Sequence, residues 1–178
     1  MIKTLALSGL VEYEPYSGVR LTEAGTTLAT HVLRRHRLIE LFLVEIVGLD
    51  WSEVHEDAER LEHAVSDRLI ERIDELLGHP SVDPHGDPIP DSSGLLVQKR
   101  YQTLLACPLE SPLTVVRVSD QSPDFLRHLE GNGVGVGSDV VVARRSEAGD
   151  SVQLRLVDGS ELTLGFHAAA KIFVEQAS

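Results

Sequence analysis

The sequence predicts an α+β protein in which a helical N-terminal half precedes a C-terminal half made of strands. Between residues 22 and 78, apolar side chains recur at the three- and four-residue spacing of amphipathic helices. The following stretch, HPSVDPHGDPIPDSSG, is rich in Pro, Gly, Asp and Ser and excludes a continuous helix. After it, short alternating segments such as SVQLRLVDGSELTLG indicate about five strands, which is typical of a small β-barrel.

The first 25 residues predict the end of a helix followed by a β-hairpin. Gly9 is the expected C-cap of the helix, and LVEYE and GVRLT alternate around a turn at residues 15–18. Helix, tight turn, hairpin and a further helix follow one another as in the latter half of a winged helix-turn-helix, although an ordinary surface hairpin gives the same pattern. Lys3 and Arg20 are the candidates for contacts with DNA phosphates.

Three helices are expected in the region that follows. Thr22 is the expected N-cap of a long helix that ends near Gly48. Asp50 is the expected N-cap of a second helix, and Ser66 or Asp67 begins a third. Farther along the chain, VDGSELTL predicts a hairpin, and one helical turn is expected near FLRHL.

The segment HEDAERLEH places several metal-capable side chains on one face of the second helix. Glu59, Glu62 and His63 form a set of oxygen and nitrogen donors without sulfur. Such a set suits Mn2+ or Fe2+ and also accepts Zn2+, Co2+ or Ni2+. The alternative is a solvated face on which the glutamates pair with Arg37 and Arg60.

A second candidate set comes from two helices. His36 and Glu40 lie one turn apart on the long helix, and His55 is brought in by the next helix. The Pro-rich turn DPHGDPIP, which contains His85, is expected to be structural. Trp51 is expected to pack in the helical domain.

Composition and charge limit the possible functions. The chain has 178 residues and a net charge of −12, which argues against broad nonspecific binding to nucleic acid. Cys107 is the only cysteine, which excludes an internal disulfide and a zinc site built on paired cysteines. No apolar run approaches the roughly 20 residues that span a bilayer, and no signal peptide is evident, so no membrane partner and a cytoplasmic location are expected. Without HExxH or a nucleophile elbow, an enzyme is not expected.

An ordered series of motifs covers residues 9–90 without an evident gap: GLV, LTEAG, RRHRLIE, GLDWSEVHEDAERLEH and DPHGDPIP. This series resembles the diphtheria-toxin-repressor family of iron- and manganese-dependent transcriptional regulators. The C-terminal segment is similar, mainly through VGSDV, to the SH3-like domain of many members. The resemblance implies a partial winged helix-turn-helix, a helical metal-binding and dimerisation domain, a linker and an SH3-like β-barrel. The corresponding residues are 1–25, 26–90, 91–107 and 108–178.

The resemblance also implies that a metal-loaded homodimer binds a palindromic operator and regulates genes of metal homeostasis. Family roles carried over residue by residue make Glu59, Glu62 and His63 the primary metal site, and His36, Glu40 and His55 the ancillary site. Iron-sensing members have a cysteine where this chain has Glu59, so Mn2+ is favoured over Fe2+. Possible further ligands from the SH3-like domain are Asp120, Gln121 and Asp124.

The sequence departs from the family pattern at its start. In the family a complete helix-turn-helix precedes the wing, whereas Met1 falls inside the expected recognition helix. Operator binding is therefore expected only if the helix-turn-helix is completed, and metal binding at the primary site is expected to be weaker. The alternative function is a dimeric metal-binding remnant that does not itself bind DNA.

Overall fold

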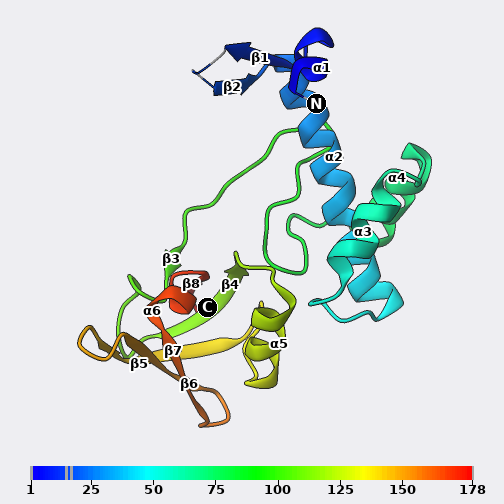
Figure 1. Cartoon of the computed structure of the whole chain (residues 1–178). Helices are drawn as coiled ribbons and strands as arrows, with labels where there is room; N and C mark the ends of the chain where they lie inside the picture. Colours follow the sequence, from blue (N-terminus) through cyan, green and yellow to red (C-terminus); the bar gives the residue numbers. More distant parts are fainter. Residues whose placement is uncertain (1, 15, 17, 178) are drawn as a thin grey trace.

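The computed structural model describes residues 2–14, 16 and 18–177, and it contains a helical part and a β part joined by an extended loop region (Figure 1). The hairpin lies at the N-terminal end of the long helix, away from the β part. The turn expected at residues 15–18 includes Pro15 and Ser17, which lie outside the described residues. Among the described helices, none has the length and apolarity needed to cross a bilayer. The elements of the helical part are α1 (Ile2–Leu7), β1 (Val11–Glu14), β2 (Gly18–Leu21), α2 (Glu23–Phe42), η1 (Leu43–Val47), α3 (Val54–Glu62) and α4 (Asp67–Leu76).

Side-chain caps set the starts of two of these helices. The Thr22 hydroxyl accepts a hydrogen bond from the Gly25 amide at 3.0 Å, which confirms Thr22 as the N-cap of α2. Ser66 caps α4 in the same way. The prediction for Asp50 is wrong: its carboxylate accepts from the Ser52 amide at 2.7 Å within a turn, and α3 begins only after Glu53.

The end of α2 determines how α3 returns along it. The helix continues into the π-helical turn η1, where the hydrogen-bond spacing widens, and ends at Gly48 with φ of 80°. The chain then reverses, so that α3 and α4 pack on α2 through a common apolar core. Buried members of that core are Leu38, Ile39, Leu43, Val54, Ala58, Ile70, Ile73 and Ile89.

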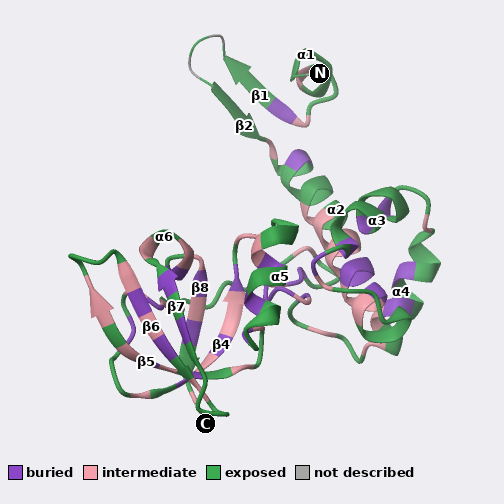
Figure 2. Ribbon diagram, turned by 60° about the horizontal axis from the view of Figure 1, so that its bottom comes forward, coloured by how far each residue is buried: buried purple, intermediate pink, exposed green. Residues whose placement is uncertain are grey.

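The β part is a six-stranded antiparallel sheet with the strand order β3-β8-β4-β5-β6-β7. The hairpin predicted at Asp158-Gly159 is confirmed between β6 and β7, and Gly159 has φ of 85°. The single helical turn expected near FLRHL is the nine-residue helix α5, on the side of the β part that faces the helices (Figure 2). The elements are β3 (Gln102–Thr103), β4 (Pro112–Val118), α5 (Pro123–Gly131), β5 (Asp139–Ser146), β6 (Ser151–Leu156), β7 (Glu161–Gly165), α6 (Phe166–Ala169) and β8 (Ile172–Gln176).

The stretch LLVQKRYQTLL contributes less strand than its pattern suggests. Only Gln102 and Thr103 pair with β8, and the residues before them carry no regular structure. Leu104 and Cys107, within the predicted linker, are buried in the core of the β part. Buried residues alternate with less buried ones along the strands, so this core lies along one face of the sheet (Figure 2).

The DPHGDPIP turn joins the two parts. The Val118 amide of β4 donates to the His85 carbonyl at 2.8 Å. A Cβ added at Gly86 would lie 2.0 Å from the Val116 carbonyl oxygen, so only glycine allows this close approach. Trp51 packs against the core of the β part and stacks on His85, so the expectation that it packs in the helical domain is wrong.

Two glycines with nearly equal φ angles test this contact. Gly86 has φ of 82°, and Gly159, at φ of 85°, has open space around its missing Cβ. We expect Gly159→Ala to cost only the left-handed strain of about 1–2 kcal/mol, and Gly86→Ala to cost clearly more because the new methyl group overlaps β4. Urea denaturation of both variants measures the difference. Equal losses would contradict the close packing of the turn on β4.

Candidate metal centre

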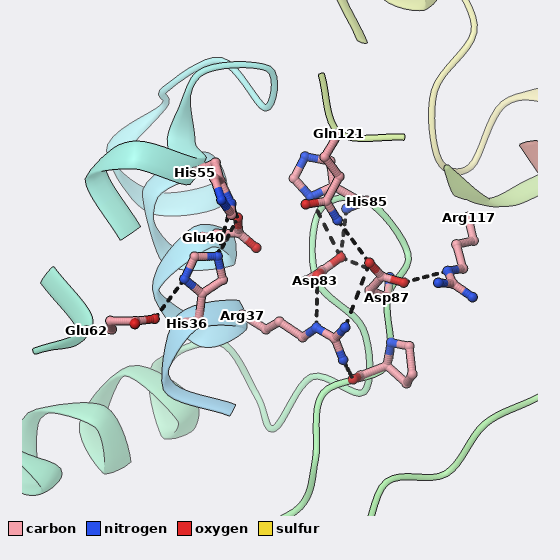
Figure 3. Close-up of polar contacts among 11 residues, drawn as sticks. His36, Arg37, Glu40, His55, Glu62, Asp83, His85, Asp87, Arg117 and Gln121 are labelled. Atoms are coloured by element: carbon pink, nitrogen blue, oxygen red, sulfur yellow. Dashed lines mark hydrogen bonds and ion pairs between the residues drawn. The ribbon is translucent and has the colours of Figure 1, made fainter. Parts of the chain in front are cut away.

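Two helices bring a histidine pair around a buried carboxylate. His36 and Glu40 lie one turn apart on α2, and His55 projects from the first turn of α3 (Figure 3). Glu40 Oε1 is 3.0 Å from His36 Nε2 and 3.2 Å from His55 Nδ1. The two ring nitrogens are themselves 3.2 Å apart. The structure thus brings together the three residues of the predicted ancillary set.

The burial of Glu40 makes this arrangement significant. Its side chain is 1% exposed, whereas that of His36 is 15% and that of His55 is 57% exposed. A buried carboxylate needs a compensating cation, whether a proton on an imidazole or a metal ion. His55 forms the solvent-facing side of the cluster, through which an ion can reach Glu40.

His36 also contacts a second carboxylate. Its Nδ1 lies 2.8 Å from Glu62 Oε2, so the ring lies between Glu40 and Glu62 (Figure 3). Burial alone lowers the pKa of His36, but hydrogen bonds and charge from the two carboxylates outweigh burial and raise it above the ordinary 6.5. The pKa of Glu40 is lowered because His36 overcomes the opposing effect of burial. The pair therefore stabilises the fold below pH 6.5, and this stabilisation is lost as pH rises through the raised pKa of His36.

The predicted primary set is less compact. Glu62 Oε1 lies 3.4 Å from His63 Nε2, but the His63 side chain is 75% exposed at the C-terminal end of α3. Glu59 lines an apolar groove of about 560 Å³ between α1, the hairpin, α2 and α3. In the described part of the chain, compact sets of three donors occur twice, and neither set includes Glu59 or His63.

The other compact set was not predicted as a site. Glu40, Asp83 and His85 are all buried, and donor atoms from the three lie within 4.8 Å of one another. Asp83 Oδ1 accepts the amides of His85 and Asp87, each at 2.9 Å. The only sequence feature that could have indicated this set is the acidic turn DPHGD, and the same residues are equally typical of an ordinary loop.

The carboxyl group of Asp83 is strongly perturbed. Burial raises its pKa from 3.8 to about 7, and the negative charges of Asp87 and Glu40 contribute to the increase. The Asp87 amide and the guanidinium of Arg37 oppose this shift. Arg37 Nε lies 3.5 Å from Asp83 Oδ2.

The three candidates from the β part have other partners. Lys171 Nζ lies 2.5 Å from Asp120 Oδ2, and this interaction lowers the pKa of Asp120 to about 2. Asp124 pairs with Arg127 at 2.8 Å on the surface of α5. Gln121 donates to Asp87 Oδ2 at 2.9 Å (Figure 3). It therefore contacts the DPHGD turn but belongs to neither donor set.

The donors around Glu40 fit a divalent transition metal. They are imidazole nitrogens and carboxylate oxygens without sulfur, a combination that accommodates Mn2+ and Fe2+. The helices hold these donors in place, since His36 and Glu40 share a face of α2 and buried Val54 and Ala58 fix α3 against it.

Comparison with known proteins identifies the family. A model of the iron dependent repressor, metal binding and dimerisation domain, matches residues 22–91, and a FeoA domain model matches residues 102–176. The chain is 31% identical over 192 residues to the iron-dependent repressor IdeR of Mycobacterium leprae, covering 98% of this chain and 80% of that protein. The chain belongs to the iron-dependent repressor family. The resemblance seen in the sequence and the α+β fold with a C-terminal FeoA, SH3-like unit are thereby confirmed.

Solved structures extend the match. A manganese-dependent transcriptional repressor in complex with manganese is 42% identical, with a TM-score of 0.89, and the match covers 99% of this chain and 81% of that one. The manganese regulator SloR is 32% identical, with a TM-score of 0.80 and the same coverage. Other curated relatives match over a shorter length. IdeR of Mycobacterium tuberculosis is 39% identical over 50% of this chain, and the match spans only 39% of that protein.

The perturbed carboxyl of Asp83 gives a prediction for the metal-free protein. Between pH 3.8 and about 7 the folded protein holds a proton on Asp83 that the unfolded chain releases. This group therefore lowers the free energy of unfolding as pH rises through that interval, by up to about 1.4 kcal/mol per pH unit. Asp83→Asn removes the titration but keeps an oxygen for the two amides.

Urea denaturation in chelator at about pH 5 and about pH 7 measures this effect. We expect the wild type to lose more stability than Asp83→Asn across this interval. Parallel losses in the two proteins would show that Asp83 titrates normally.

Proposed function

We propose that the chain is a homodimeric, Mn2+- or Fe2+-dependent transcriptional regulator that acts in the cytoplasm on operator DNA of metal-homeostasis genes. The observation that carries this proposal is the buried Glu40 carboxylate held between His36 and His55 in a chain of the iron-dependent repressor family. Similarity to repressors over 80% of the length of one and 81% of another supports a regulatory role. It favours this role over that of a metal-binding module without DNA binding.

The proposed ligands fall in two groups. His36, Glu40 and His55 hold one ion, and Glu59, Glu62 and His63 hold another after the exposed side chains of Glu59 and His63 turn inward. Oxygen and nitrogen donors favour Mn2+ over metals that prefer sulfur. The bound ion supplies positive charge that a proton on His36 supplies in its absence.

The cluster is placed to control the orientation of the hairpin relative to the helices. It connects α3 to the C-terminal half of α2, and the N-terminal end of α2 carries the hairpin. Arg20 on β2 and Lys3 on α1 are exposed at that end and are the proposed phosphate contacts. Metal that binds more tightly to one arrangement of these helices shifts the population toward it. For the homodimer, the exposed leucines Leu69 and Leu76 of α4 supply an apolar surface.

A mobility-shift experiment tests metal control of DNA binding. A duplex selected from random sequences in the presence of Mn2+ is expected to be retarded with Mn2+ and released in chelator. We expect His36→Gln to abolish the Mn2+ effect, whereas His79→Gln, which alters an exposed histidine outside both donor sets, leaves it intact. Equal retardation with and without Mn2+ contradicts metal control. No retardation in either condition contradicts DNA binding by this chain.

The raised pKa of His36 predicts a pH dependence of metal affinity. Because a proton and a metal ion compete for the same nitrogen, Mn2+ affinity is expected to rise as pH increases from below 6.5 through the raised pKa of His36. Binding in the lower part of this interval should release up to one proton from this ring. Titration calorimetry in buffers of different ionisation enthalpy measures both quantities. An affinity independent of pH over this interval would contradict the role of His36 as a ligand.

A further inference from the structure

A side chain of α2 holds the C-terminal end of α3. Arg35 Nε donates to the carbonyl oxygen of Glu62 at 3.0 Å, and Nη2 of the same guanidinium donates to the carbonyl oxygen of Val65. The last carbonyl groups of a helix have no partner inside the helix, so an arginine that binds them fixes where the helix ends. Nη1 pairs with the carboxylate of Asp67, the first residue of α4. Arg35 therefore connects the end of α3 and the start of α4 to α2.

Two consecutive residues of α2 contact Glu62 at two points. His36 Nδ1 lies 2.8 Å from Glu62 Oε2 (Figure 3), whereas Arg35 binds the backbone carbonyl of Glu62. The side chain of Glu62 is 9% exposed and that of Arg35 is 20% exposed. Hydrogen bonds that are largely shielded from water are stronger than exposed ones. The bond from Arg35 thus fixes the backbone from which the Glu62 carboxylate reaches His36.

The neighbouring residue His63 depends on the same contact. It is the C-cap of α3, and its Nε2 lies 3.4 Å from Glu62 Oε1. Because the His63 side chain is mostly exposed, packing does little to place it. The amides of Ala64 and Val65 close the turn after α3 with backbone hydrogen bonds of 2.9 Å. Loss of the Arg35 bonds would loosen this turn and with it the directions of both side chains.

The charge of Arg35 alone would act against metal binding. A guanidinium close to a cation repels it, so a basic residue beside a metal site lowers the affinity unless it has another role. The Asp67 side chain that pairs with Arg35 is almost fully exposed, and such surface pairs contribute little. The two carbonyl bonds are therefore the contacts that can place the ligands. A lysine would keep the charge but lacks the planar fork of donors that reaches both carbonyl groups.

We propose that Arg35 is a positioning residue for the proposed metal ligands Glu62 and His63. It acts through the carbonyl groups of Glu62 and Val65 and not as a ligand. This role rests on the proposed function, specifically on the ion assigned to Glu59, Glu62 and His63. It also gives the effect of a substitution a definite sign. Removal of a positive charge alone raises the affinity for Mn2+, whereas loosening of the turn that carries the ligands lowers it.

Equilibrium dialysis of the full chain against MnCl2 tests this sign. The relevant ion is the one that His63→Gln removes. We expect Arg35→Met, which keeps the aliphatic stem but has no donor, to bind this ion about 10- to 100-fold more weakly than the wild type. Arg35→Lys, which keeps the charge, is also expected to bind it more weakly, and it replaces Arg35→Met if that variant does not fold. Arg34→Met is the matched control, because Arg34 bonds the Pro90 carbonyl at 2.7 Å and Asp74 at 2.9 Å, away from α3.

Hydrogen exchange in chelator provides a readout that needs no ion. The amides of Ala64 and Val65 are expected to exchange faster in Arg35→Met than in the wild type or in Arg34→Met. Unchanged or higher Mn2+ affinity in the folded Arg35 variant, an equal loss in Arg34→Met, or unchanged exchange of both amides overturns the inference. If His63→Gln still removes an ion in that case, the proposed metal site stands. A wild type that binds no Mn2+ overturns both the inference and the proposed function.

Discussion

The structure around the centre depends on the burial of one charged group, the carboxylate of Glu40. An anion that is 1% exposed inside a small helical core persists only when positive charge or hydrogen-bond donors surround it. His36, one turn earlier on the same helix, and His55, on α3, provide these contacts. The chain reversal between η1 and α3 brings His55 back to α2. The local backbone geometry therefore places a donor where the buried Glu40 carboxylate needs one.

The DPHGD turn links this carboxylate to the β part of the molecule. Asp83 and His85 approach Glu40, while Asp87, two residues on, contacts Arg117 and Gln121 of the β part. The backbone of the turn also pairs with β4 through the Val118 amide. A change of charge at Glu40 therefore acts on a segment that both parts share, and not on a side chain isolated in one helix.

Features governed by local spacing were predictable from the sequence. The caps at Thr22 and Ser66 and the convergence of His36 with Glu40 follow from helical geometry. Placement of His85 beside Glu40 did not follow, because 45 positions of chain separate them and no periodicity relates a loop to a helix face. Spacing also predicted which residues share the HEDAERLEH face but not side-chain direction, so Glu59 lines a groove instead of joining a compact set.

Metal sensing requires that the protein without metal be less stable than the metal-bound protein, but still folded. A proton on His36 meets this condition: it neutralises Glu40 and Glu62 in part, and the same ring nitrogens are the donors that an ion needs. In the proposed site, a metal ion would therefore take the place of a positive charge that is already there. Since only the difference between the two states shifts the helices, the free energy available for control is the binding energy of the ion minus that of the proton it displaces.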